Sequence, residues 1–231
     1  EMCIRDSLSS YCCLYSQGFT KKTYYCTSIN RFNNQHKFHL PSTEVSFPLN
    51  MMLPKLIQSN LKTVMIGQRI KYYSQLDSTN QKACELIAHN EGTHGTLVVT
   101  DNQHLGKGRR NNNWFMGTGK GVAVSLILDN PLSKEDTLFL PLITGIAAVK
   151  SLCSHNVVSK LKWPNDLMIN SKKIGGILCE SRISSSEVKY IILGLGINVN
   201  ETIEDLPEYL HQMATSLFIE TGEIQQRELI I

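Results

Sequence analysis

The stretch KLKWPNDLMINSKKIGGILC, residues 160–179, decides the fold of this chain. Its runs of apolar residues predict three short strands, at 160–163, 167–169 and 173–179. Asn170-Ser171-Lys172 is typical of a hairpin turn between the second and the third strand. Pro164 ends the first strand, because proline cannot donate a hydrogen bond to a sheet. The stretch therefore predicts neighbouring strands joined by tight turns.

Further elements are expected on both sides of this stretch. Strands are predicted at 64–73, 95–100, 122–128 and 188–199. Ser78-Thr79-Asn80-Gln81 is a capping box that opens a helix running to His89. A third helix is expected to begin near Glu223. Another helix is expected after the strand at 122–128, because apolar residues recur there at helical spacing. They are Phe139, Leu142, Ile143, Ile146 and Ala147.

A glycine-containing basic loop, Gly106-Lys107-Gly108-Arg109-Arg110, lies between two predicted strands. Glycine lets the backbone approach a ligand closely, and the loop gathers three cations in one place. Such a loop suits a polyphosphate, because charge-assisted and bidentate contacts are the strong ones. A solvated basic loop is an equal alternative. The segment matches neither the Walker pattern nor the dinucleotide-binding fingerprint.

Two further segments place polar groups at the ends of strands. Asn165 and Asp166 follow Pro164, which fits either a ligand site or an ordinary β-turn. Lys173 begins a strand that contains Gly175 and Gly176, and paired glycines weaken a strand. One interpretation is a ligand lying on bare backbone while Lys173 reaches its charged group. The other is a bulge in a charged edge strand.

Composition limits the classes of function. The 231 residues include 23 Lys and Arg against 20 Asp and Glu, and a net charge of +3 is too weak alone to indicate nucleic-acid binding. No apolar run approaches the roughly 20 residues of a membrane span, so a transmembrane protein is excluded. The seven cysteines form no Cys-x-x-Cys pair, which argues against a zinc site, and a disulfide framework is not expected.

Residues 1–60 differ from the rest of the chain. No acidic residue occurs between Asp6 and Glu44, and basic residues are scattered among Ser, Thr, Tyr and Asn. No helical or strand period persists there. The segment is expected to be an irregular N-terminal extension, either an organelle transit peptide or a non-native leader. The folded domain is predicted over residues 61–231.

Five motifs follow one another in a fixed order over residues 64–200. They are Ser78-Thr79-Asn80, the segment Asp101–Arg110 with Trp114, Lys162–Asp166, Lys173–Leu178 and Gly196-Ile197-Asn198. Together they resemble the biotin–protein ligase family. The resemblance implies an α+β domain with a mixed, largely antiparallel sheet flanked by helices, similar to class II aminoacyl-tRNA synthetases. It also implies an enzyme that activates biotin with ATP to biotinoyl-5′-AMP and then transfers biotin to a lysine of a biotin carboxyl carrier domain.

The resemblance also assigns roles to individual residues. Lys173 and Arg109 are expected to be catalytic. The expected biotin-binding residues are Ser78, Thr79, Asn80, Gln103, Lys107, Gly108, Arg109, Lys173, Gly175 and Gly176. The expected ATP- and adenylate-binding residues are Gly106, Arg109, Arg110, Trp114, Lys162, Asp166 and Asn198.

The chain departs from the family pattern at several positions. Lys107 stands where the family usually has Arg, Asn111 and Asn112 replace a frequent Gly-Arg pair, and Met116-Gly117 replaces Ser-Pro. The family also continues into a small C-terminal β-barrel that residues 61–231 lack, so the catalytic domain is expected to be truncated. Two alternatives to the full ligase stay open. A lipoate–protein ligase would share the fold and the adenylation step, and a truncated chain could bind biotin without full activity.

The resemblance further implies ATP and biotin as substrates, with Mg²⁺ bridging the phosphates and no protein metal site. The expected partner is the carrier domain of a biotin-dependent carboxylase, and no membrane partner is expected. DNA is not expected as a partner, because residues 1–60 lack the periodicity of a helix-turn-helix domain. The oligomeric state stays open. The expected location is the cytoplasm, or a mitochondrion or plastid if residues 1–60 are a transit peptide.

Overall fold

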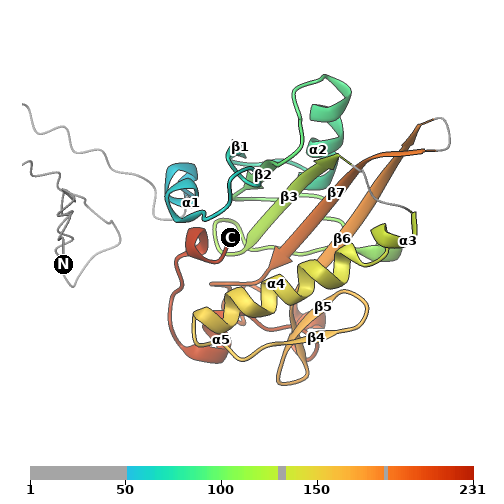
Figure 1. Ribbon diagram of the computed structural model, residues 1–231. Helices are drawn as coiled ribbons and strands as arrows, with labels where there is room; N and C mark the ends of the chain where they lie inside the picture. Colours follow the sequence, from blue (N-terminus) through green and yellow to red (C-terminus); the bar gives the residue numbers. More distant parts are fainter. Residues whose placement is uncertain (1–50, 130–133, 185–186) are drawn as a thin grey trace, which may run out of the picture. The chain divides into compact units, whose positions relative to one another are not determined.

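A seven-stranded sheet in the order β1-β2-β3-β7-β6-β5-β4 forms the centre of the computed structural model, which describes residues 51–129, 134–184 and 187–231 (Figure 1). The strands are β1 (Arg69–Tyr73), β2 (Thr96–Thr100), β3 (Val122–Asp129), β4 (Lys160–Lys162), β5 (Asp166–Ile169), β6 (Lys172–Ser184) and β7 (Glu187–Ile197). Only β1 and β2 pair in parallel, and the other neighbours pair antiparallel. The predicted mixed, largely antiparallel sheet is confirmed.

Five helices and three 3₁₀ turns accompany the sheet in this part of the chain. The helices are α1 (Pro54–Asn60), α2 (Thr79–Ala88), α3 (Lys134–Thr137), α4 (Leu140–Ser154) and α5 (Leu217–Thr221). The 3₁₀ turns are η1 (Arg109–Asn111), η2 (Glu208–Leu210) and η3 (Arg227–Leu229). From the sequence, residues 1–60 are expected to be a transit peptide or a leader and to lack a helix-turn-helix domain. Residues 1–50 of this segment lie outside the described residues.

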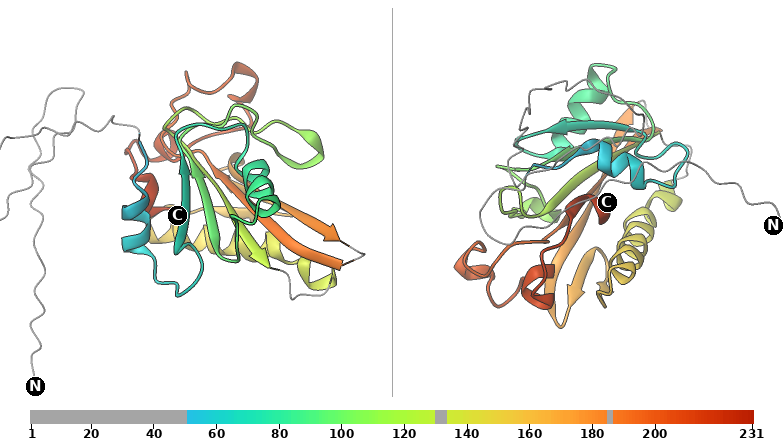
Figure 2. Two further views of the ribbon diagram at one scale, coloured as in Figure 1. Left: turned by 90° about the horizontal axis from the view of Figure 1, so that it is seen from above. Right: turned by 90° about the vertical axis from the view of Figure 1, so that its left-hand side faces the viewer.

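The two faces of the sheet pack against different helices. Successive strand residues point to opposite faces, so Leu97 and Val99 of β2 join one core while Val98 joins another. The larger core includes α1, α4 and the segment after α5, and the smaller one includes Ala83 and Leu86 of α2. Figure 2 shows α2 and α4 from two further directions. The face covered by α2 also carries the cavity described below.

A buried carboxylate, Asp101, ties three distant segments together at the end of β2. It accepts hydrogen bonds from the Met52 amide at 3.0 Å and from the Tyr72 hydroxyl at 2.5 Å. Arg227 forms an ion pair with it at 2.7 Å, and both side chains are more than nine-tenths buried. Burial, together with the Asp101 contact, raises the pKa of Tyr72. Asp101 therefore links α1, β1 and the segment after α5.

Several predicted boundaries hold and others move. Ser78 caps α2 by accepting from the Gln81 amide, and Asn170 and Ser171 form the hairpin turn with positive φ angles. The strand predicted at 64–73 begins only at Arg69. Pro54–Asn60 form α1, with Ile57 in the core, although they were expected to belong to the irregular extension. The folded unit accordingly begins at Met52, not at residue 61.

The predicted helix is present as α4, but the apolar residues noted at helical spacing do not form its buried face. Phe139, Ile143 and Ile146 are exposed, whereas the residues buried from this helix are Gly145, Ala148 and Leu152. Apolar residues surround most of the helix, so spacing alone does not select a face. The buried face includes Gly145, where a β-carbon would lie 2.5 Å from Leu161 Cδ1, so glycine lets the helix approach Leu161 closely on this side.

The helix expected near Glu223 is absent from the described residues. Ser216 instead caps the short helix α5, and Gly222 ends it with a φ of +73°. Glycine adopts this left-handed conformation without the strain that a β-carbon would bring, so it is the usual residue for ending a helix. The chain beyond Gly222 then continues irregularly to η3.

Candidate active site

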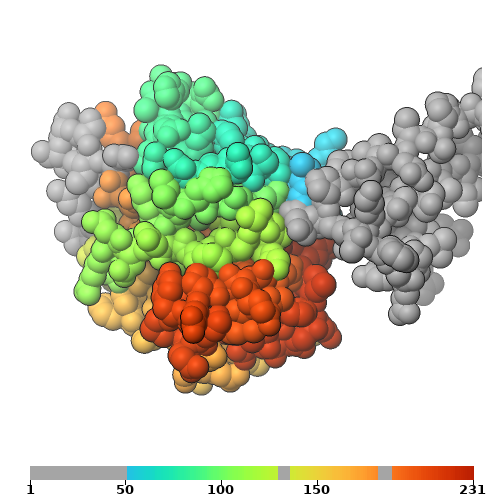
Figure 3. All heavy atoms as spheres, turned by 180° about the vertical axis from the view of Figure 1, so that it is seen from behind, coloured from blue at the N-terminus to red at the C-terminus, as the bar shows by residue number. Residues whose placement is uncertain are grey.

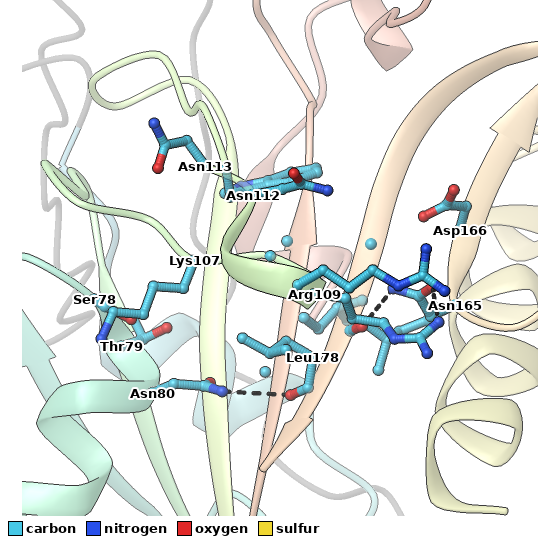
Figure 4. Close-up of a pocket in the computed structure, with 18 of the residues that line it drawn as sticks. Ser78, Thr79, Asn80, Lys107, Arg109, Asn112, Asn113, Asn165, Asp166 and Leu178 are labelled. Carbon is cyan, nitrogen blue, oxygen red and sulfur yellow. Dashed lines mark hydrogen bonds between the residues drawn. The ribbon is translucent and has the colours of Figure 1, made fainter.

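A cavity of about 330 Å³ opens on the face of the sheet that α2 covers, with its floor on β6 and β7. Figure 4 shows Ser78, Thr79 and Lys107 on one side of it and Asn165 and Asp166 on the other. Twelve of the sixteen residues expected from the sequence line it: Ser78, Thr79, Asn80, Gln103, Lys107, Gly108, Arg109, Arg110, Trp114, Asp166, Lys173 and Gly176.

Four expected site residues lie outside the lining. Gly175 is one, because neighbouring strand residues point to opposite faces and Gly176 takes the cavity face. A β-carbon on Gly175 would instead lie 2.9 Å from Leu167 Cδ1, in the core. Gly106 supports the loop, since its carbonyl accepts from the Trp114 amide at 2.8 Å.

The other two are Lys162 and Asn198. Lys162 is exposed on β4, which is an edge strand of the sheet. Asn198 is buried beyond the end of β7, where its Nδ2 donates to the Thr215 carbonyl at 3.0 Å. Direct ligand contacts by Lys162, Gly175 and Asn198 therefore find no support in this geometry.

The start of α2 is joined to Gln103. The Gln103 side-chain oxygen accepts from the Thr79 amide at 2.8 Å and from the Thr79 hydroxyl at 3.1 Å. The first turn of a helix has unpaired amides and a positive dipole end, and both favour polar or anionic groups nearby. Ser78, Thr79 and Gln103 thus form one hydrogen-bonded polar wall of the cavity.

The basic loop spans the rim of the cavity, from the α2 side at Lys107 to Asn165 on the other side. Arg109 Nη1 donates to Asn165 Oδ1 at 3.1 Å (Figure 4), and Lys107 Nζ donates to Gln81 Oε1 at 3.4 Å. The Gly108 amide donates to the Asn112 carbonyl at 2.7 Å, which closes the loop on itself. The three cations expected at one place are therefore brought to the rim of a cavity.

Asn111 shows why a departure from the family pattern is tolerated. Arg110 and Asn111 have φ angles of 56° and 61°, in the left-handed region. Among residues with a side chain, Asn is one of the few that enters this region routinely, and it replaces the more usual Gly.

We expect Asn111→Val to loosen this loop, because a β-branched residue is strained at positive φ by about 1–2 kcal/mol or more. The Gly108 amide should then exchange with deuterium about 5–30-fold faster. Asn111→Gly is the matched control and should leave the rate within about threefold. Equal rates in all three proteins would contradict the proposed strain.

An ion pair lies at the cavity floor where β6 begins. Lys173 Nζ lies 2.6 Å from Asp166 Oδ1 and 5.7 Å from the centroid of the Trp114 ring. The Lys173 backbone is held on both sides, because its amide donates to the Met213 carbonyl and its carbonyl accepts from the Thr215 amide. The ammonium is thus fixed at the cavity with about a third of its side chain exposed.

The glycines of β6 and β7 form a floor without side chains, but protein groups already use part of it. Gly176 and Gly196 are directly paired, and a β-carbon on Gly196 would lie 2.6 Å from Trp114 Cε2. The Asn80 carboxamide packs against Gly194, two residues earlier, where a β-carbon would overlap Asn80 Oδ1. The close approach expected of a ligand is therefore made here by two side chains of the protein.

A buried carboxylate stabilises the turn that follows Trp114. Glu201 accepts from the Gly117 amide at 3.1 Å and from the Val199 amide at 2.7 Å. Burial raises the pKa of Glu201, and these backbone hydrogen bonds oppose the shift. Lys120 pairs with Asp205 beside it. The segment after β7 thus packs against the segment that leads into β3 (Figure 3).

The expected ligand-binding residues do not include several residues that line the cavity. These are Asn112, Asn113, Pro164, Asn165, Ile177, Leu178, Gly194, Leu195 and Gly196. Asn165 and Gly196 stand inside quoted motifs, so their positions were available as a signal. Asn113, Leu178 and Leu195 carry no chemical signal in the sequence, because only the pairing of strands brings them to the cavity.

The described residues contain neither a clustered metal site nor a helix that could span a membrane. No group of three or more His, Cys, Asp or Glu side chains within residues 51–129, 134–184 and 187–231 could hold a metal ion. In the same ranges, none of the helices has the length and apolar character needed to cross a membrane.

Comparison with known proteins agrees with this geometry. Residues 72–198 match the model of the Biotin/lipoate A/B protein ligase family. The chain belongs to this family. Over 176 residues it is 40% identical to the bifunctional ligase/repressor BirA of Bacillus subtilis, covering 76% of this chain and 54% of that protein. The chain spans about half the length of the curated relatives it matches first.

A second relative and a solved structure extend the comparison. The chain is 32% identical to the chloroplastic biotin–protein ligase 1 of Arabidopsis thaliana, over 67% of this chain and 41% of that protein. The biotin protein ligase of Aquifex aeolicus in complex with biotin and ATP is similar with a TM-score of 0.60 and 29% identity. That match covers 71% of this chain and 65% of the other. The fold is thus that of the biotin protein ligases, which is similar to class II aminoacyl-tRNA synthetases.

Proposed function

We propose that Met52–Ile231 is the catalytic domain of a biotin–protein ligase. The reaction is ATP-dependent activation of biotin to biotinoyl-5′-AMP, followed by transfer to a lysine of a biotin carboxyl carrier domain. The observation that carries the proposal is that one cavity gathers the polar start of α2, the basic loop and Lys173. Similarity to biotin ligases, one of them solved with biotin and ATP, supports biotin over lipoate as the substrate.

The proposed chemistry needs no nucleophile from the protein. In the first step, the biotin carboxylate attacks the α-phosphorus of ATP and pyrophosphate leaves. In the second, the acceptor amine attacks the biotinoyl carbonyl, loses a proton and releases AMP. Both reacting groups of the first step are anionic, so fixed cations that neutralise them lower the barrier. Lys173 on the floor and Arg109 on the rim supply these charges.

The polar wall at α2 suits the uncharged end of biotin. Thr79 and Gln103 are already paired with each other, which leaves the Ser78 hydroxyl, the lone pairs of the Thr79 hydroxyl and the Gln103 amide nitrogen to pair with a cyclic urea. Lys107, Gly108 and Arg110 would close over the ligand from the loop. Trp114 already stacks on Gly196 and offers an aromatic face beside Lys173.

Mg²⁺ is proposed to arrive with ATP. Proteins commonly bind this ion through one or two carboxylates together with substrate phosphates. Asp166 is the carboxylate among the cavity-lining residues, and it is already paired with Lys173 at 2.6 Å, so the phosphates of ATP would supply the main ligands of the ion. The ion would neutralise phosphate charge and assist the departure of pyrophosphate.

The cytoplasm is the proposed location. Cys84, Cys153 and Cys179 are free thiols in the described part of the chain, which supports a reducing compartment. The proposed partner is the carrier domain of a biotin-dependent carboxylase.

Mass spectrometry of a carrier domain incubated with this chain, ATP and biotin tests the proposal. We expect one biotinoyl group on one lysine, and no modification without ATP. Pyrophosphate release measured in parallel separates the two steps, because a domain that only activates biotin releases pyrophosphate without labelling the carrier. Modification with lipoate instead of biotin, or no pyrophosphate release with biotin, would contradict the proposal.

A further inference from the structure

Both N–H donors of the Asn80 side chain are taken by protein partners, although the sequence suggested that Asn80 contacts biotin. Its Oδ1 accepts from the Ser125 hydroxyl at 2.5 Å, and its Nδ2 donates to Glu180 Oε2 at 2.8 Å. Nδ2 also donates to the Leu178 carbonyl at 3.4 Å (Figure 4). A carboxamide has two N–H hydrogens, and both have acceptors here. No donor of Asn80 is therefore left for a ligand while these contacts hold.

Glu180 fixes which way the carboxamide faces. An ionised carboxylate only accepts hydrogen bonds, so the nitrogen end of Asn80 must point toward Glu180. The hydroxyl of Ser125 could donate or accept, and it cannot fix the orientation by itself. Asn80 and Ser125 are both buried, at 3% and 0% exposure, so the orientation is set inside the protein.

The position of the carboxamide leaves little freedom. It lies over Gly194 of β7, where a β-carbon would overlap Asn80 Oδ1. Leu178 of β6 is paired directly with Gly194, so both Asn80 acceptors on β6 lie beside this point. Glu180 is the charged one of the three partners, and hydrogen bonds to charged groups are the stronger ones.

Glu180 itself does not line the cavity that holds the proposed ligands. It lies in a neighbouring cavity of about 390 Å³, formed with Leu105, Leu178 and the loop from Lys107 to Asn113. Leu178 and the loop line both cavities. Nothing in the proposed chemistry uses Glu180. Its carboxylate acts on the first cavity only through Asn80.

We propose that Glu180 is a positioning residue for biotin. It holds Asn80 flat on β7, and Asn80 in turn keeps the first turn of α2, with the Ser78 and Thr79 groups, against the cavity floor. This inference rests on the proposed biotin ligase function. Asn80 then shapes the end of the cavity for biotin, and its side chain does not donate to the ligand.

Steady-state kinetics of Glu180→Ala and Glu180→Gln test this role. Loss of a hydrogen bond to a charged partner corresponds to about 10–100-fold, so Glu180→Ala should raise the KM for biotin by about tenfold or more. The KM for ATP and kcat should stay within about threefold. Glu180→Gln should stay near wild type, because the glutamine oxygen can still accept from Asn80 Nδ2.

Glu223→Ala is the control, since Glu223 is exposed and distant in the sequence from the cavity segments. It should change neither KM. An unchanged KM for biotin in Glu180→Ala, an equal rise for both substrates, or a Glu180→Gln variant as impaired as the alanine variant would overturn the positioning role. A wild-type chain that does not turn over biotin would contradict the proposed function, and the inference with it.

Discussion

Replacing Lys173 by alanine is expected to slow biotinoyl-AMP formation by about 10²–10³-fold, with a much smaller effect on biotin binding. The ammonium lies at the cavity floor, paired with Asp166, where the reacting carboxylate and phosphate would meet. Removing one preorganised group that stabilises transition-state charge typically costs this much in rate. Lys173→Arg should restore only part of it, because a planar guanidinium cannot occupy the site of a compact ammonium.

Lys172→Ala is the matched control for this experiment. Lys172 precedes Lys173 on the same strand, but its Nζ donates to the His211 carbonyl at 2.9 Å and does not line the cavity. Pyrophosphate release should therefore stay within about threefold of wild type. Calorimetry with biotin separates the effects of Lys173→Ala on binding and on rate. Equal rate losses at both lysines, or none at either, would remove the support for a catalytic Lys173.

Replacing Arg227 by methionine is expected to lower the free energy of unfolding by about 3–5 kcal/mol. This is the usual effect of removing one partner of a buried ion pair, because the other charge stays buried without compensation. Asp101 would keep its contacts with Tyr72 and the Met52 amide but lose its counter-charge. Arg227 Nη1 also donates to the Gly121 carbonyl at 3.1 Å, and that contact would be lost as well.

Urea unfolding monitored by circular dichroism measures the change, since the midpoint shifts in proportion to stability at constant slope. Lys82→Met is the control, because Lys82 and Glu85 form an ion pair on an exposed face of α2. That pair should contribute about 0.5 kcal/mol or less. A loss below about 1 kcal/mol in Arg227→Met would show that the Asp101 cluster does not hold these segments together.

The strands of residues 160–179 and the helix at 78–89 illustrate what local patterns predict well. Apolar runs broken by Pro164 and by the Asn170–Ser171 turn leave few alternatives to a hairpin. The cap at Ser78 likewise fixes where α2 begins. These features depend on neighbours in the sequence, so the sequence contains them directly.

The face of α4 and the partners of the glycines illustrate what local patterns cannot predict. Apolar residues surround α4, and its buried side is the one on which Gly145 lies close to Leu161. The sequence suggested a close approach at Gly175 and Gly176 of β6, whereas Gly194 and Gly196 of β7 are the glycines that Asn80 and Trp114 approach closely. The groups that approach them, Trp114 and Asn80, come from other segments and are chosen by the pairing of strands.

The sequence by itself determined the family, the order of the strands along the chain and most of the cavity residues, because motif spacing and hydrophobic period are local properties. The tertiary structure decided which of two adjacent glycines faces the cavity, since that depends on the pleat of β6. It also decided that Asn80 is held by Glu180, 100 residues away. Contacts between such distant residues are set only when the sheet brings their strands and helices together.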